Sequence, residues 1–522
     1  MGKHDRNRPG LPTPGPPHRH IGRDGHLPHR ASFQSGGGRP AGRPGPAAQG
    51  LLKEDGGSLK RRKIAEIICE IPYYQYFLTV EELDRSSRVL AREYPSVVRL
   101  EEIGRSQEGR PIYALHIGEG PRTAFLFATP HPNEPIGAML VEFLSQKLAQ
   151  DREFREWSGF KWVLVKCSDP DGTRLNEGWF RGPFTPLNYA RHFYRPPHHQ
   201  QVEWTFPVHY KTLHFDSPLP ETRALMRVIQ EEKPLFIYSL HNAGFGGAYF
   251  YVTEPCEPLY GPLRAGAVSQ GIPLHLGEPE MPYAVKLSDA IYLMPRIQDS
   301  YDYLARHSHK DPAEVLRGGT SSADYARSLV PDAFVLVCEV PYFYDPRIED
   351  LSPSDVERRQ AVLHSVELSE GMYWFLSQAL ERIRNHLTVR SRLREAVEEF
   401  LRTMPEHLKA KRRWAESASE LSSPATVSQV FDSRQLTRFY GMLLYGMFIR
   451  MVEEELSSRS AHPGKGELEE VRARVEEELL RHNEVFMSQL DHRVIPIRNL
   501  VAVQLTAALA AAKYLQSGRK GE

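Results

Sequence analysis

Short, almost uninterrupted apolar runs, several of them followed by helical patterns, constrain the fold of this chain more than any other feature. The runs have the length and the β-branched and aromatic content of strands. They lie at 97–100, 112–117, 123–128, 162–166, 235–240, 248–252 and 334–340, with helical patterns at 136–148 and 221–232. Strands that are apolar along their whole length are buried on both faces. We therefore predict an α/β fold with a mixed, largely parallel sheet flanked by helices.

The two ends of the chain differ from this middle part. The first residues are rich in Pro, Gly, Arg and His and have no apolar periodicity, which is typical of a disordered tail. From about Val366 onward Glu, Arg, Leu and Ala dominate, and their periodicity is helical. We predict a disordered N-terminal tail over 1–63, an α/β domain over 64–365 and an all-α C-terminal domain over 366–522.

Charge and cysteine usage limit the classes of partner. The 66 basic and 66 acidic residues cancel, which argues against a nucleic-acid or membrane-surface binder. Residues 1–64 nevertheless hold 13 Lys or Arg against four acids, so a cationic tail precedes an acidic body. The four cysteines lie far apart, which argues against a disulfide scaffold. The N-terminus is unlike a secretory signal, and the apolar stretch at 500–515 is too short to span a bilayer. We expect a cytoplasmic protein with no membrane partner and, apart from the basic tail, no nucleic-acid partner.

Polar residues stand where several of the predicted strands end. His131 and Glu134 follow the run 123–128 as an H-x-x-E pair, and His241 follows the run 235–240. Glu339 lies at the end of a run that begins at residue 334 and is costly to bury without a partner or a metal. Ligands of α/β sheets bind beyond the carboxyl ends of the strands. A lone histidine is more often structural, but an imidazole and a carboxylate three residues apart can converge on one zinc ion.

Six ordered segments resemble the zinc metallocarboxypeptidase family, of the carboxypeptidase A and B type, over roughly residues 76–343. They are Ile103–Ile112 (IGRSQEGRPI), His131–Glu134 (HPNE), Asp169–Gly172 (DPDG), Ser239–Asn242 (SLHN), Gly318–Thr320 (GGT) and Val337–Val340 (VCEV). Several motifs in the family's order are far more specific than any one of them. The chain is similar to bacterial members that would carry an extra helical C-terminal domain.

The resemblance implies a set of roles for individual residues. His131, Glu134 and His241 would hold one Zn²⁺ ion with a position open for water. Glu339 would be the general base that takes a proton from that water. An arginine would stabilise the oxyanion, for which Arg181 is the best match and Arg174 the rival.

The chain departs from the family pattern at the clamp for the terminal carboxylate. Asn188 matches the asparagine of the usual Asn-Arg pair, but Tyr189 stands where the arginine belongs. Arg191, two residues further on, would then supply the bidentate fork that carboxylates prefer, or it is a surface charge. The tyrosine that usually caps the substrate has no counterpart, and Tyr303 and Tyr325 are the candidate substitutes.

The leading hypothesis is a zinc-dependent metallopeptidase that releases the C-terminal residue from peptides. The missing clamp arginine keeps open a zinc amidase or deacylase that acts on a small acylated amino acid or a modified side chain. A third reading is a non-catalytic zinc-binding scaffold whose helical domain makes the partner contacts. Glu339 argues against this third reading, because a scaffold has no use for a base at that strand end.

Overall fold

The computed structural model describes residues 58–458 and 463–519 of the chain, and they belong to one compact unit. The predicted tail lies outside these residues as far as position 57. Helix α2 (Ser58–Cys69) begins a little before the predicted end of the tail. The division of the remainder into an α/β domain and a helical domain at residue 365 stays a prediction.

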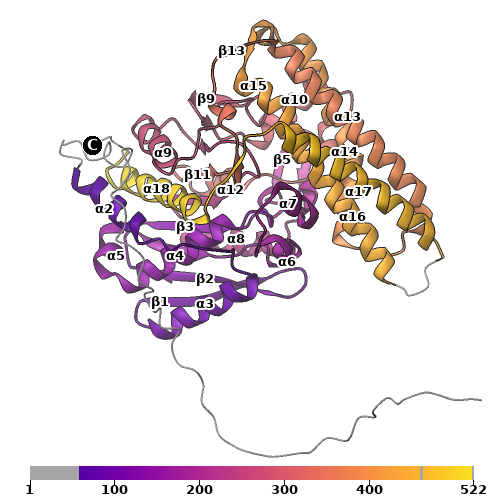
Figure 1. Cartoon of the computed structure of the whole chain (residues 1–522). Coiled ribbons are helices and arrows are strands. Elements are labelled where there is room, and N and C mark those ends of the chain that lie inside the picture. The colour runs from indigo at the N-terminus through magenta and orange to yellow at the C-terminus, as the bar shows by residue number, and fades with distance from the viewer. Residues whose placement is uncertain (1–57, 459–462, 520–522) are drawn as a thin grey trace, which may run out of the picture. The chain divides into compact units, whose positions relative to one another are not determined.

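A nine-stranded mixed sheet forms the centre of the structure, as the apolar runs predict (Figure 1). In spatial order its strands are β1 (Val98–Arg105), β2 (Pro111–Ile117), β4 (Lys161–Val165), β3 (Thr123–Ala128), β7 (Phe236–Leu240), β11 (Phe334–Glu339), β8 (Tyr249–Val252), β10 (Ile291–Leu293) and β9 (Val285–Ser288). The four central strands β4, β3, β7 and β11 run parallel. Because β3, β7 and β11 are neighbours, their carboxyl ends meet at one edge of the sheet.

Alternate residues of the central strands pack into two different cores. Leu126 and Leu164 face the core that contains α4 (Ile136–Gln150). Phe125 and Val163 face the core that contains α8 (Pro220–Glu232) and α12 (Ser322–Leu329). Side chains of a strand point alternately to its two sides, so both faces of this sheet are covered. This explains why the sequence of these strands lacks a polar face.

The remaining helices of the α/β part are short or lie around the sheet. They are α3 (Val80–Glu93), α5 (Arg152–Ser158), α6 (Pro170–Asn176), α7 (Pro186–His192), α9 (Glu257–Ser269), α10 (Ile297–His307) and α11 (Pro312–Leu316). Helix α3 begins with a capping box, in which the Thr79 hydroxyl accepts from the Glu82 amide and the Glu82 carboxylate accepts from the Thr79 amide. The pattern at Thr79–Glu82 predicts this start, because both groups satisfy amides that the helix leaves unpaired.

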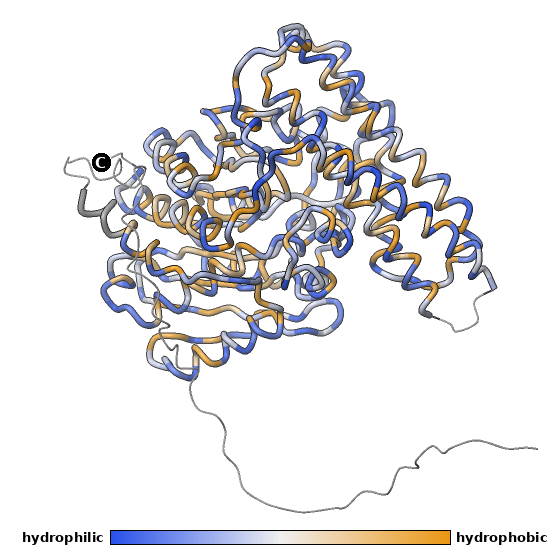
Figure 2. The backbone as a smooth tube through the Cα atoms, in the orientation of Figure 1, coloured by the Kyte–Doolittle hydropathy of each residue, from blue (hydrophilic) through white to orange (hydrophobic). Residues whose placement is uncertain are grey.

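Four long helices follow the sheet in the sequence and pack against one another. They are α13 (Arg358–Ile383), α14 (Arg392–Ser417), α16 (Thr437–Ser458) and α17 (Lys465–Ser488). Helix α15 (Val427–Phe431) continues into α16 through a π-helical turn at Asp432–Leu436. Figure 2 shows hydrophobic and hydrophilic residues alternating along these helices, whereas the central strands are mostly hydrophobic. The C-terminal region is therefore helical, as its periodicity predicts.

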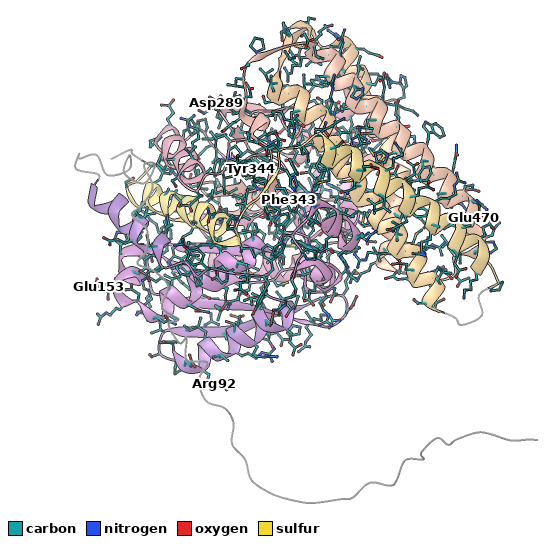
Figure 3. All side chains as sticks on the ribbon, viewed as in Figure 1. Arg92, Glu153, Asp289, Phe343, Tyr344 and Glu470 are labelled. Carbon is teal, nitrogen blue, oxygen red and sulfur yellow. The ribbon has the colours of Figure 1, made fainter. Side chains whose placement is uncertain are left out.

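Short two-stranded ladders connect the chain just after the central sheet with the C-terminal helical region. A β-ladder joins β12 (Phe343–Tyr344) to β15 (Arg493–Val494), and another joins β13 (Pro353–Glu357) to β14 (Pro424–Thr426). A separate hairpin is formed by β5 (Val208–Tyr210) and β6 (Leu213–Phe215). Phe343, which Figure 3 labels, has its ring 6.3 Å from that of Phe245 and 6.4 Å from that of Phe439 on α16. The sheet and the helical region thus share one aromatic core.

The final helix, α18 (Ile497–Gln516), returns to the sheet and packs beside α4 and α9 (Figure 1). It lies on the face of the sheet formed by β7 and β11 and is buried along most of its length. Within the described residues, none of the helices combines the length and the apolar character that crossing a membrane requires. All four cysteines are free thiols, as their spacing predicts. The cytoplasmic location stays a prediction.

Helix α16 crosses α7 at very close range. A Cβ atom at the buried Gly446 would overlap the carbonyl oxygen of Ala190, a backbone atom that cannot move aside as a flexible side chain could. We expect Gly446→Ala to lower the free energy of unfolding by about 1–3 kcal/mol, as overpacking does, measured by urea denaturation. Gly371→Ala on α13 is the control, because a Cβ there meets nothing within 4 Å. It should be neutral or stabilise by about 0.5–1 kcal/mol. Equal urea midpoints for Gly446→Ala and the wild type would contradict the close contact between α16 and α7.

Candidate metal and active site

Two central strands deliver the predicted metal ligands to the same edge of the sheet. Strand β3 ends at Ala128, and the chain then turns through Thr129, whose φ of 53° is in the left-handed region. A threonine rarely adopts this conformation, and such strain is concentrated at functional sites. The turn leads to His131 and Glu134 just before α4, while His241 follows β7 directly.

The side chains of His131, Glu134 and His241 form one buried cluster. A ligand atom from each lies within 4.8 Å of the other two. His241 Nδ1 is 3.1 Å from Glu134 Oε2, and the two imidazole rings are 4.7 Å apart. His131 Nδ1 is buried and has no hydrogen-bond partner among the described residues. An unpaired buried nitrogen that faces a carboxylate and a second imidazole fits a zinc site, because these are the donors that Zn²⁺ prefers.

The electrostatics of the cluster also fit a metal. Burial, together with the charges of Arg195 and His241, holds the pKa of His131 well below its usual value. His131 is therefore a neutral imidazole, which is the state that binds metal. Burial lowers the pKa of His241, but the hydrogen bond and charge of Glu134 oppose it and raise the pKa to about 9. A metal ion would replace the proton that His241 shares with Glu134.

Further contacts fix the Glu134 carboxylate and the backbone beside it. Arg195 Nη1 donates to Glu134 Oε1 at 2.9 Å, and the Asn242 amide donates to Oε2 at 3.3 Å. The side chain of Gln504 on α18 is fully buried and donates to the carbonyl of His241 at 2.7 Å. The last helix of the chain thus holds the backbone of one of the predicted ligands.

Glu339 ends β11 beside the cluster, as its position at the end of an apolar run predicts. Its Oε1 lies 4.0 Å from His241 Nδ1, and only 12% of its side chain is exposed. Burial first, and then the negative charge of Glu134, raise the pKa of Glu339 well above its usual value. A carboxyl with a raised pKa next to a metal cluster has the properties of a general base.

All four residues face a cavity of about 670 Å³. One wall comes from the α/β part, including Arg195, Tyr249, Tyr251 and Ser321. The opposite wall comes from the C-terminal helices and includes Met372 and Leu376 of α13, Met404 and Lys411 of α14, and Tyr440 and Leu444 of α16. The helical region is therefore part of the candidate site.

Three of the predicted site residues lie outside this cavity. Arg181 pairs with Glu82 at 2.6 Å and its guanidinium stacks 3.8 Å from the ring centre of Tyr76. Asn188 donates to the carbonyl of Pro183 at 2.9 Å, and Arg191 pairs with Glu476 on α17. The nearby carboxylates of α3 and α17 hold the two arginines at the surface, so the structure does not bring them to the cluster. The rival Arg174 is exposed and does not line the cavity either.

Two functional candidates were not predicted from the sequence. Arg195 supplies the cation beside Glu134, from the segment that follows α7. Tyr440 supplies a cavity tyrosine from α16, whereas the candidates Tyr303 and Tyr325 pack elsewhere. No sequence motif marks Tyr440, because its place depends on how α16 crosses α7.

Comparisons with known proteins find similarity to zinc carboxypeptidases in the part of the chain that holds the three predicted metal ligands. The sequence profile described as zinc carboxypeptidase matches residues 84–258, which include His131, Glu134 and His241. Carboxypeptidase D of Anas platyrhynchos is 22% identical over 214 residues, which are 37% of this chain and 15% of that protein. The chain thus spans only a small part of that relative. The predicted family resemblance is confirmed, and Glu339 and the helical wall lie beyond the matched residues.

A comparison with solved structures matches the chain to carboxypeptidase A from Helicoverpa armigera, at 17% identity and a TM-score of 0.33. That likeness covers 54% of this chain and 71% of the other. A metallo-carboxypeptidase from Burkholderia cenocepacia is also 17% identical, with a TM-score of 0.28, covering 52% of this chain and 61% of the other.

Proposed function

We propose that this chain, which resembles the zinc carboxypeptidases over residues 84–258, is a zinc-dependent carboxypeptidase. The observation that carries the proposal is the buried group of His131, Glu134 and His241 with Glu339 beside it in one cavity. Three ligands and a nearby base are the parts that hydrolysis of an amide bond by a metal site requires. A structural zinc site would instead use four protein ligands.

The residues of the cavity divide the reaction between them. Zinc held by His131, Glu134 and His241 would polarise the scissile carbonyl and lower the pKa of the attacking water. Glu339 takes a proton from that water and passes it to the departing amine. Its raised pKa suits this relay, because the carboxyl retains the proton until the amine leaves. Arg195, one hydrogen bond from Glu134, donates to the carbonyl oxygen as its negative charge grows.

The arginine and lysine side chains that line the cavity are Arg195 and Lys411, and burial lowers the pKa of the Lys411 amine below its usual value. The half-buried Lys411 donates to Ser365 Oγ at 3.0 Å and belongs to the helical wall. With Asn188 and Arg191 outside the cavity and Arg195 beside the reacting carbonyl, Lys411 is the basic group that a terminal carboxylate of the substrate would meet. The proposed substrate is therefore a peptide with a free C-terminus.

A panel of peptides with free or amidated C-termini tests this proposal. We expect the zinc-loaded protein to release C-terminal residues from the free peptides about 10–100-fold faster, since a charged hydrogen bond contributes about 1.5–3 kcal/mol. Chelation should abolish the activity and added zinc should restore it. Equal rates on both sets of peptides would identify an amidase that ignores the terminal carboxylate. Absence of peptide hydrolysis by the zinc-bound protein would contradict the proposal that the chain is an enzyme.

A further inference from the structure

A buried carboxylate is connected to the metal cluster through a serine. Glu203 lies on the turn Val202–Trp204 and is 4% exposed. Its Oε2 accepts from Ser239 Oγ at 2.9 Å, and Ser239 Oγ lies 2.8 Å from His241 Nε2. Its Oε1 accepts from the amide and the hydroxyl of Ser322 at 3.0 and 2.7 Å. Glu203, Ser239 and His241 thus form a continuous chain of hydrogen bonds that ends at a predicted metal ligand.

The direction of each bond in this chain follows from the donors present. The Ser322 amide can only donate, so Glu203 Oε1 is an acceptor. With a charged carboxylate, Oε2 is an acceptor too, and the hydroxyl proton of Ser239 points to it. Ser239 Oγ can then take part in a bond with His241 Nε2 only by accepting from an Nε2–H group. The other nitrogen, Nδ1, is the one that faces Glu134.

We propose that Glu203 is a positioning residue, which acts through Ser239 to keep the proton of His241 on Nε2 and so presents Nδ1 to the metal. The proposal deepens the proposed function and rests on it, because it concerns the same zinc site. A histidine that binds metal commonly donates its other N–H to an oxygen, and that bond fixes the tautomer and the ring orientation. Here a serine stands between the carboxylate and the imidazole.

The surroundings support a carboxylate in this place. Burial raises the pKa of Glu203, but the charge of His241 and the bonds from Ser322 and Ser239 act against the rise. A buried carboxylate that accepts three hydrogen bonds is well satisfied, and its removal would leave those donors unpaired. The contacts with Ser322 also tie the start of α12 to the strand end that carries His241.

Glu203→Gln tests the direction of the chain without changing its volume. The Ser322 amide requires an acceptor at the first position, so the glutamine oxygen must take it and the NH₂ group must face Ser239. Ser239 then accepts from the glutamine, and its hydroxyl proton, which has lost its carboxylate acceptor, competes with the Nε2–H group of His241 for the bond between Ser239 Oγ and Nε2. We expect zinc to bind about 10–100-fold more weakly, measured by competition with a chelator. Glu221→Gln is the matched control, since Glu221 is also buried and accepts from the Gln107 amide at 2.8 Å.

A second readout does not depend on activity. Nitrogen NMR of histidine in the zinc-loaded protein should show a proton on His241 Nε2 in the wild type and a reduced Nε2–H signal in Glu203→Gln. Ser239→Ala should weaken zinc binding similarly, and the double variant should be no weaker than the single ones. Zinc affinity and tautomer unchanged in Glu203→Gln, or additive losses in the double variant, would overturn the proposal. Zinc binding by the wild type without hydrolysis would instead count against the proposed function alone.

Discussion

Glutamine in place of Glu339 is expected to lower the rate of peptide hydrolysis by about 10²–10⁴-fold while zinc remains bound. The amide has the shape of the carboxylate but cannot accept the proton of the attacking water. Glu339 lies 4.0 Å from His241 Nδ1 and is not one of the three clustered ligands, so its loss should spare the metal. The measurements are kcat on a free-C-terminus peptide and zinc content by elemental analysis.

Glu221→Gln again serves as the control, because it exchanges a buried glutamate of the same fold that does not line the cavity. It should keep the wild-type rate. A Glu339→Gln protein that hydrolyses the peptide at the rate of the wild type would remove Glu339 from the mechanism. A protein that loses zinc together with activity would make Glu339 a ligand rather than a base.

Alanine at Arg195 is expected to reduce kcat by about 10²–10³-fold, with a smaller effect on KM. The guanidinium is 2.9 Å from Glu134 Oε1 and lines the cavity, so it can donate to a carbonyl oxygen that gains charge in the transition state. A loss confined to kcat is the signature of a contact made mainly in the transition state. Zinc affinity, measured in parallel, separates this effect from any role in orienting Glu134.

Arg181→Ala is the matched variant, since the family resemblance favours Arg181 for this role and the structure places it at the surface with Glu82. Removing an exposed ion pair costs about 0–1 kcal/mol of stability, so Arg181→Ala should retain nearly full activity. The reverse result, with loss of rate for Arg181→Ala and none for Arg195→Ala, would restore the assignment made from the sequence.

The sequence predicts where the residues of the metal cluster lie because each of them follows a strand. Strand β3 coincides with the apolar run 123–128, and β7 and β11 begin or end within a residue of their predicted bounds. Once neighbouring strands run parallel, residues just beyond their ends must meet at one edge of the sheet. The proximity of His131, Glu134, His241 and Glu339 therefore follows from strand positions, whereas their roles as ligands and base come from the family resemblance.

Arg195 and Tyr440 depend on contacts between distant segments. A long arginine side chain can pair with any carboxylate that the fold places nearby. Arg181 and Arg191 each form an ion pair with a glutamate at the surface. Tyr440 lies in the cavity wall on α16, whose Gly446 packs closely against Ala190 of α7. The sequence pattern predicts that α16 is a helix. Because apolar residues lie on nearly all sides of it, the pattern does not indicate which side contacts α7 and which faces the cavity.

The bond from Gln504 to the carbonyl of His241 sets an order of events during synthesis. A nascent polypeptide exposes His131, Glu134 and His241 hundreds of residues before α18 leaves the ribosome. Until then the face of β7 and β11 that α18 covers is bare, and His241 lacks its backbone anchor. The proposed hydrolysis therefore depends on α18, and a product that terminates before this helix is expected to be inactive and to expose an apolar surface.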